Sequence, residues 1–261
     1  MKTTQSQRAI MESITEGLRN REVVCMWGNQ PNGKSHVFYN LVSSLSGFER
    51  SAFSQERKPE RFTIDILPGI EPPSRGNADS FKVMQRQILE SYGVPIRRTK
   101  RYSSLIDLLI QLREARIMPT LALDGVEILP EKGFVLYQKL NELRDHRTGE
   151  RIGPAALLSG NFNKRRMPPN FWKHIKDVQV RRVSQAEIAE FISYLDPQYR
   201  DSFTPQALKK LADCSSTLEM SRIARNAIEY WQKHSRSEKI DVPIVTAVTD
   251  KLLHAKQRIA A

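Results

Sequence analysis

Short apolar runs alternate with amphipathic segments along the first two thirds of the chain. The runs predict buried strands, and the segments with apolar residues three or four positions apart predict helices. The predicted strands are Val23–Trp27, Phe62–Ile66, Thr120–Asp124, Ala155–Ser159 and Val178–Val183. The predicted helices are 4–19, Ser35–Leu45, Phe81–Tyr92, Leu105–Arg116 and Phe134–Arg144. Strands that alternate with helices are typical of an α/β domain, so we expect a mostly parallel sheet between helices.

The pattern changes near residue 184. Beyond it the sequence predicts only amphipathic helices, at 185–195, 204–213, 216–233 and 242–257. Ser184 and Glu187 have the spacing of a capping box, and Thr204 with Pro205 places a cap and a first-turn proline before the next helix. We therefore expect an α/β core over residues 1–183 and a small all-helical domain over residues 184–261.

The segment after the first predicted strand contains a phosphate-binding pattern. It reads G-N-Q-P-N-G-K-S and matches G-x-x-x-x-G-K-[ST], with a predicted strand before it and a predicted helix after it. Lys34 is expected to neutralise the β- and γ-phosphates of ATP, and the Ser35 hydroxyl to coordinate Mg²⁺. The predicted nucleotide-binding residues are Gly28, Asn29, Gln30, Pro31, Asn32, Gly33, Lys34 and Ser35.

A phosphate loop of this kind needs an acidic residue at the end of a neighbouring strand, acting on the Mg²⁺ or its water. Asp124 ends the run P-T-L-A-L-D and fits this role; Asp65 is a rival, but it lies inside its strand pattern. Asp124 could instead cap a turn with Gly125. Asn161 follows another strand and is a candidate for orienting water or sensing the γ-phosphate, with a simple turn residue as the alternative.

The charge balance adds a prediction about partners. Lys and Arg total 41 against 29 Asp and Glu, a formal net charge of +12, which favours a polyanionic partner such as nucleic acid or an acidic membrane surface. Basic side chains on an accessible loop give DNA affinity without reading sequence, although a solvated charge run is the alternative. The candidate DNA-binding residues are Arg97, Arg98, Lys100, Arg101 and Tyr102, with a weaker second cluster at Lys164, Arg165 and Arg166.

Other classes of protein find little support in the sequence. The two cysteines, Cys25 and Cys214, do not suggest a disulfide framework, and the five histidines are scattered rather than clustered for a metal. No apolar run reaches the roughly 20 residues of a membrane span, and the first residues lack the apolar core of a secretory signal. We expect a cytoplasmic protein with no membrane partner.

The order of phosphate loop, L-A-L-D-G, L-L-S-G-N and helical C-terminal part resembles the AAA+ ATPases. The short form looks most like the transposition regulators MuB, TnsC, TniB and IstB. The resemblance spans nearly the whole chain in order and spacing, and the phosphate loop is its one specific motif. It implies an AAA+ P-loop core with a helical lid, Asp124 as the Mg²⁺-directed Asp of the Walker B strand, and Asn161 at the sensor-one position.

The chain departs from that family at the position after Asp124. The family commonly has a Glu there that polarises the attacking water, whereas this chain has Gly125, and Glu127 is the nearest substitute. We therefore expect slow ATP hydrolysis, with a turnover below about 1 s⁻¹, or ATP binding that serves as an assembly switch.

Two arginine positions of the family are also altered. Where members that hydrolyse ATP between subunits place an arginine before the fifth strand, this chain has Lys173 and Lys176, and a lysine cannot make the planar bidentate contact of a guanidinium. In the lid, Arg222 and Arg225 are both candidates for the sensor arginine.

The resemblance implies an ATP-dependent, largely non-sequence-specific DNA-binding regulator of DNA transposition and recombination. Such a protein forms an oligomer or filament on double-stranded DNA and recruits a transposase, and the basic run near residue 100 matches the loop that tracks the DNA backbone in TnsC-like proteins. A helicase loader or replication initiator of the AAA+ type is an alternative. A P-loop small-molecule kinase, or a signalling module without DNA, would leave the charge of +12 unexplained.

Overall fold

The computed structural model divides into two compact units. The sheet unit comprises Ile10–Asn29 and Lys34–Gln179, and the helical unit comprises Met1–Ala9, Gln30–Gly33 and Val180–Ala261. The predicted domain boundary between residues 183 and 184 stays a prediction. The structure describes residues 3–28, 32–45, 62–70, 80–95, 101–129, 131–161, 175–181, 183–195, 197–199, 201–214, 216–235 and 237–260.

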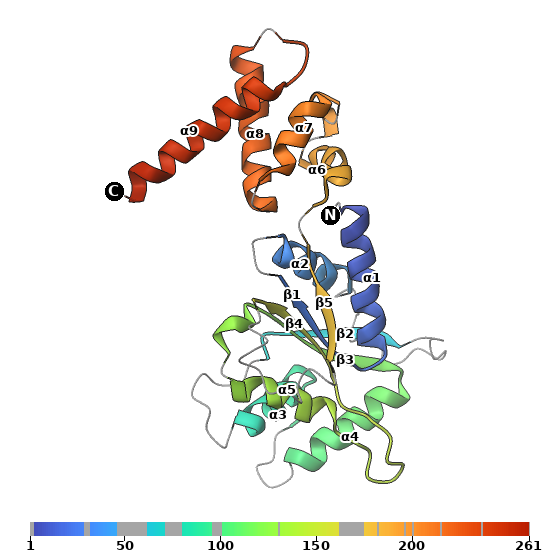
Figure 1. Ribbon diagram of the computed structural model, residues 1–261. Coiled ribbons are helices and arrows are strands. Elements are labelled where there is room, and N and C mark those ends of the chain that lie inside the picture. The colour runs from blue at the N-terminus through green and yellow to red at the C-terminus, as the bar shows by residue number, and fades with distance from the viewer. Residues whose placement is uncertain are drawn as a thin grey trace. The chain divides into compact units, whose positions relative to one another are not determined.

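The sheet unit is built on a parallel sheet with the strand order β2-β3-β4-β1-β5 (Figure 1). Every pairing in it is parallel, so each connection crosses over the sheet, as helices between the strands allow. This confirms the predicted parallel sheet between helices. The strands are β1 (Val23–Trp27), β2 (Thr63–Pro68), β3 (Ile117–Asp124), β4 (Ala155–Gly160) and β5 (Ile175–Gln179).

The predicted fifth strand, Val178–Val183, was placed too late in the sequence. In the structure β5 begins at Ile175, which is in register with Val23 of β1. β5 is an edge strand with one buried position, Val178. Its sequence therefore contains polar residues and does not form an apolar run. β3 likewise begins earlier than predicted, at Ile117, because its pairing with β2 extends to that residue.

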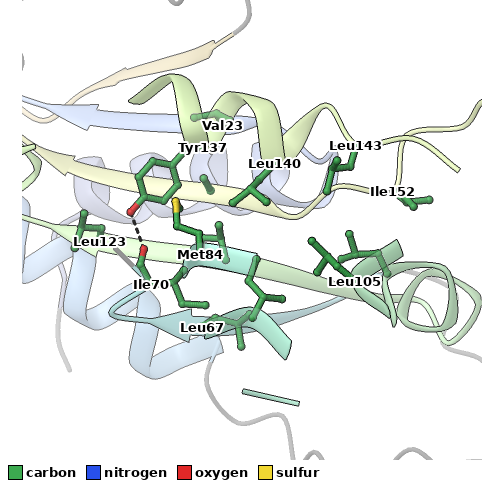
Figure 2. Close-up of a cluster of buried hydrophobic side chains, with 14 of the residues drawn as sticks. Val23, Leu67, Ile70, Met84, Leu105, Leu123, Tyr137, Leu140, Leu143 and Ile152 are labelled. Carbon is green, nitrogen blue, oxygen red and sulfur yellow. Dashed lines mark hydrogen bonds between the residues drawn. The ribbon is translucent and has the colours of Figure 1, made fainter. Parts of the chain in front are cut away.

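One face of the sheet is covered by α3 (Ser80–Ser91), α4 (Arg101–Glu114) and α5 (Glu131–Asn141). Met84, Leu109 and Tyr137 bring these helices into one core and are almost fully buried. The Tyr137 hydroxyl donates a hydrogen bond of 2.7 Å to the carbonyl oxygen of Ile70 (Figure 2). The buried hydroxyl of Tyr137 therefore has a hydrogen-bond partner, and this bond links α5 to the segment after β2.

The opposite face of the sheet is covered by α2 (Lys34–Leu45), which packs against β2, β3 and β4. Alternate strand residues point to opposite faces. Val24, Met26 and Leu157 are buried but stand outside the core just described, and α2 supplies the buried Val37 and Leu41. The sheet is thus sandwiched between helices.

The helical unit has its own core. Ile192, Leu211, Ile223 and Val245 are buried together. The Thr204 side chain accepts a hydrogen bond from Ala207 N at the start of α7, as the cap prediction required. None of the helices in the described part of the chain combines the length and hydropathy of a membrane span. The helices are α6 (Ile188–Leu195), α7 (Pro205–Ala212), α8 (Thr217–His234) and α9 (Val242–Ala260), with the short 3-10 helices η6 (Gln185–Glu187) and η7 (Pro197–Tyr199).

The first residues of α1 (Gln5–Arg19) belong to the helical unit, where they form hydrogen bonds with the carboxylate of Glu187. Ser6 donates to Glu187 from its backbone N–H (2.8 Å) and from its hydroxyl (2.9 Å), and the Ser184 hydroxyl donates to the same carboxylate (2.7 Å). Partial burial alone would raise the pKa of Glu187, but the hydrogen bonds from Ser184 and Ser6 outweigh it and lower that pKa to about 2. Arg8 adds an ion pair with Glu190 at 3.2 Å.

Candidate nucleotide-binding site

The central strands of the sheet end together at one edge. Asp124, the last residue of β3, is in register with Ser159 of β4, and Ser159 is in register with Met26 of β1. Gly28, the first residue of the phosphate-loop pattern, follows β1 directly. The carboxyl edge of a parallel α/β sheet is where such folds bind ligands. The predicted Asp124 therefore lies at the edge from which the phosphate loop departs.

The structure describes both ends of the phosphate-loop pattern. Gly33 has φ of +86°, in the region that favours glycine, and α2 begins with the next residue, Lys34. The Lys34 ammonium donates a hydrogen bond of 2.8 Å to the carbonyl oxygen of Gly28. Ser35 is exposed in the first turn of α2. The predicted residues Asn29, Gln30 and Pro31 lie outside the described residues.

The Lys34 ammonium lies in the field of two carboxylates. Its burial lowers its pKa, while the charges of Glu127 and Asp124 act in the opposite direction. The tertiary structure thus brings the lysine of the loop, the acid at the end of β3 and the acid three residues later into one electrostatic neighbourhood. A phosphate group there would meet a cation already flanked by acids suited to a divalent ion.

A tight turn carries Glu127 back to the sheet edge. Gly125 adopts the left-handed conformation (φ 78°, ψ 34°) and starts the 3-10 helix η3 (Val126–Ile128), in which Val126 is fully buried. Glu127 Oε2 then accepts a hydrogen bond of 3.2 Å from the backbone N–H of Asn161. Two predicted site residues that are 34 positions apart are therefore in direct contact, and the substitute acid faces the end of β4.

Gly160 makes that approach possible, and sequence reasoning did not single it out. A Cβ atom on Gly160 would overlap Glu127 Oε2, and it would lie 2.9 Å from Val126 Cγ2 and 3.0 Å from Val126 N. The absence of a side chain therefore lets η3 close over the end of β4. In the sequence, only the glycine between Ser159 and Asn161 could have indicated that another segment approaches the backbone closely at this point.

Ser159 is a second residue that the prediction did not assign. Its side chain is fully buried, and its hydroxyl oxygen has no hydrogen-bond partner in the described part of the chain. Strand alternation places Ser159 on the same face as its neighbour Asp124, the face that α2 covers. An unsatisfied hydroxyl beside a carboxylate suits a hydrated cation or a phosphate oxygen, because Mg²⁺ takes oxygen ligands and keeps several waters. The donor set at this edge fits ATP with Mg²⁺.

Asp65, the rival acid, has another role. It is buried in the middle of β2, in register with Pro119, and accepts a hydrogen bond of 2.5 Å from the Tyr92 hydroxyl. It lies inside its strand rather than at the carboxyl edge, so the geometry favours Asp124 for the nucleotide site.

The predicted DNA-binding residues are only partly described. α4 begins at Arg101 rather than at the predicted Leu105, so Arg101 and Tyr102 lie in its first turn and not in a loop. The Tyr102 side chain is 55% exposed. The helix starts early because no residue between Arg101 and Leu105 opposes helix formation. Arg97, Arg98, Lys100, Lys164, Arg165 and Arg166 lie outside the described residues.

The family's two arginine positions remain predictions. Lys173 lies outside the described residues, and Lys176 stands near the start of β5, with its ammonium 3.6 Å from Glu16 Oε2. Arg222 and Arg225 are both exposed on α8 of the helical unit.

Comparison with known proteins supports the fold. No protein-family model and no curated protein sequence matches the chain. It is similar to Cdc6p from Pyrobaculum aerophilum (TM-score 0.52, 14% identity, 92% of this chain and 65% of that one). It is also similar to a RuvB mutant from Thermotoga maritima (TM-score 0.54, 13% identity, 94% and 70%) and to the ORC2 protein from Aeropyrum pernix, solved as ADPNP-ADP complexes (TM-score 0.51, 15% identity, 94% and 66%).

The chain therefore shares the fold of these three structures: a parallel sheet between helices, with a helical part after it in the sequence. The chain spans slightly less than two thirds of the length of the Cdc6p and ORC2 structures. At identities of 13–15% the likeness defines the fold, while the activity has to be argued from the residues.

Proposed function

We propose that this protein is an ATP-dependent AAA+ regulator that assembles on duplex DNA without sequence specificity and recruits a transposase. The observation that carries the proposal is the convergence of Lys34, Asp124 and Glu127 at the sheet edge that bears the Gly-Lys-Ser sequence. The net charge of +12 supplies the attraction to DNA.

Each residue of the site has a distinct task. Bound Mg²⁺ supplies positive charge against the β- and γ-phosphates, and the Ser35 hydroxyl and the Asp124 carboxylate would hold it. With nucleotide bound, the Lys34 ammonium would exchange its bond to the neutral Gly28 carbonyl oxygen for one to a phosphate oxygen, where both partners are charged and the bond is therefore stronger. The contact between Lys34 and Gly28 therefore links the two ends of the pattern, and nucleotide would replace it.

Glu127 takes the place of the acid missing after Asp124. Its carboxylate accepts from the Asn161 N–H, so Asn161 holds the group that would take a proton from the attacking water. A general base that is placed by a turn and held by one backbone contact should be less effective than an acid directly on the strand. This is the reason to expect a turnover below about 1 s⁻¹ and a nucleotide whose main role is to favour assembly.

Nucleotide and DNA would act on the same assembly. A ligand that binds only the assembled form stabilises it by mass action, and two such ligands strengthen one another's binding reciprocally. The exposed Tyr102 and the neighbouring Arg101 at the start of α4 are the described members of the basic cluster that would face the DNA backbone. Their contacts to phosphate would weaken with salt and would not depend on sequence.

The test is fluorescence anisotropy of a labelled duplex of arbitrary sequence, titrated with protein with and without Mg²⁺-ATP. We expect tight, salt-sensitive binding that requires ATP, and loss of the ATP effect in Lys34→Ala. Arg101→Gln should weaken binding, while Arg86→Gln, which removes an exposed arginine paired with Glu90 on α3, serves as the matched control. Equal binding with and without nucleotide would contradict the coupling, and absence of binding in both would refute the DNA role.

A helicase loader or replication initiator is the second candidate, favoured by the likeness to Cdc6p and ORC2. It shares the ATP site and the DNA attraction, so only the protein partner separates the two. Affinity purification of the tagged protein on DNA with ATP should retain a transposase under the first proposal and a replicative helicase under the second.

A further inference from the structure

A cavity of about 800 Å³ lies at the opposite, amino edge of the same sheet. The starts of β1 and β5, the end of α5 and the two arginines Arg144 and Arg151 surround it. Val23 and Ile175, which are register partners, give it an apolar wall, and Val23 also belongs to the core shown in Figure 2. The volume is that of a small-molecule pocket.

Three cationic side chains line this cavity: Lys176 is paired with Glu16, whereas Arg144 and Arg151 have no ion pair with a described carboxylate. Arg151 Nε donates to the carbonyl oxygen of Asn141 at 2.9 Å, and its terminal nitrogens have no hydrogen bond to the described residues. Its burial and the charge of Arg144 lower the pKa of Arg151, against the influence of Glu142 and Glu22. Arg144, which also lines the cavity, donates to the carbonyl oxygen of Gly149 at 2.8 Å.

A buried arginine lies beside this group. Arg21 is only 9% exposed and donates through Nη1 to the carbonyl oxygens of Ile152 (3.1 Å) and Gly153 (3.3 Å). Its Nη2 is buried without a hydrogen-bond partner among the described residues, and its guanidinium carbon lies 5.0 Å from the centre of the Phe62 ring. Burial, followed by the charges of Arg113 and Arg151, lowers the pKa of Arg21 to about 10. Arg113 is paired with Glu150, and Glu142 and Glu22 partly offset the charge of Arg151, whereas Arg21 has no ion pair with a described carboxylate. The fold therefore brings several guanidinium groups close together with incomplete neutralisation, and an anion would add to that neutralisation.

Two carboxylates limit which anion fits. Glu22 and Glu142 also line the cavity; Glu22 Oε2 is buried without a partner in the described part of the chain, and Glu142 accepts from Gln138 Nε2 at 2.8 Å. These acids would repel a polyphosphate, but they can accept hydrogen bonds from hydroxyl or amino groups. The lining thus combines guanidinium forks for one oxyanion, acceptors for donor groups and a short apolar wall.

We propose that this cavity binds a small organic phosphate that carries hydroxyl or amino donors, of about the size of a nucleoside monophosphate. Arg144 and Arg151 hold the phosphate group, because planar guanidinium forks match phosphate oxygens. Glu22 accepts from the donor groups. The site is separate from the phosphate loop and does not depend on the proposed function.

The test is isothermal titration of the full chain with adenosine 5′-monophosphate, ribose 5-phosphate, inorganic phosphate and adenosine as probes. We expect the two organic phosphates to bind, inorganic phosphate to bind at least tenfold more weakly, and adenosine to give no signal. Arg144→Gln, at an exposed residue, and Arg151→Gln should each weaken binding tenfold or more. Arg86→Gln and Lys34→Ala should bind as the wild type does.

Several results would overturn the proposal. No binding of either organic phosphate at about 1 mM would do so, because a built site should reach that affinity. Binding that disappears in Lys34→Ala and persists in Arg144→Gln would assign the signal to the phosphate loop. Equal affinities for inorganic and organic phosphate would refute the role of Glu22. Arg151→Lys separates charge from geometry: it should keep the fold and still bind weakly, and full affinity would refute the guanidinium fork.

Discussion

The substitution Gly160→Ala tests whether Glu127 must reach the end of β4. The added Cβ would meet Glu127 Oε2 and would lie 2.9 Å from Val126 Cγ2 and 3.0 Å from Val126 N. The carboxylate of an exposed glutamate can swing away, whereas Val126 is fully buried and its backbone belongs to the turn at Gly125. The methyl group should therefore displace Glu127 and strain η3.

The expected magnitude follows from overpacking. Forcing a methyl group into a packed contact costs about 1–3 kcal/mol of unfolding free energy. For a protein of this size that lowers the melting temperature by about 2–4 °C per kcal/mol. The functional effect should be larger, because loss of a positioned general base typically costs about 10²-fold or more in rate. Gly160→Ala should lower ATP hydrolysis at least tenfold while nucleotide binding persists.

Two measurements check this expectation: urea unfolding and single-turnover hydrolysis of ATP at saturating protein. Glu127→Gln is the comparator, since it removes the base without steric strain. Gly93→Ala is the control: Gly93 has φ of +66° with no atom within 4 Å of an added Cβ, so it should cost about 1 kcal/mol and leave hydrolysis unchanged. If Gly160→Ala is as stable and as active as Gly93→Ala, the packing argument and the role of Glu127 are both wrong.

Three further predictions concern stability and charge. Glu187→Gln should lower the unfolding free energy by about 1 kcal/mol at pH 7, a figure reduced for solvent screening. Because the folded pKa of Glu187 is depressed to about 2, this contribution is present above about pH 5 and is lost as the pH falls toward 2. Urea unfolding at pH 7 and at pH 3 should therefore show a smaller difference between mutant and wild type in acid. Thr204→Ala removes the cap of α7 and should lower the unfolding free energy by about 1 kcal/mol, measured by the same method, and an unchanged midpoint would show that the cap is dispensable. Arg101→Gln should reduce the slope of log affinity for DNA against log salt by about 1, and an unchanged slope would exclude a phosphate contact.

Features that depend on neighbouring residues were readable in the sequence. The strands β1, β3 and β4 are buried on both faces and therefore appear as short apolar runs. The cap at Thr204 involves residues within one turn. The pattern from Gly28 to Ser35 is equally local, since it is read from eight consecutive residues.

Features that depend on contacts between distant segments were not readable. β5 was placed too late because an edge strand keeps polar residues on its open side, and its position follows from pairing with β1. The start of α4 was placed four residues too late, because its first turn carries polar side chains. An apolar pattern does not mark the start of β5 or the start of α4, because part of each element is exposed to solvent.

The sequence by itself determined the parallel sheet and the net positive charge, and it contains the pattern Gly28–Ser35 and the acid at the end of β3 on which the predicted site rests. Only the tertiary structure decided that Glu127 contacts Asn161 and that Gly160 must lack a side chain. It also decided that Arg21 is buried near Arg151, with no hydrogen-bond partner for its Nη2 among the described residues. The physical reason is that a pattern along the chain encodes burial and local turns, whereas register and tight turns bring residues far apart in sequence to the same edge of a sheet.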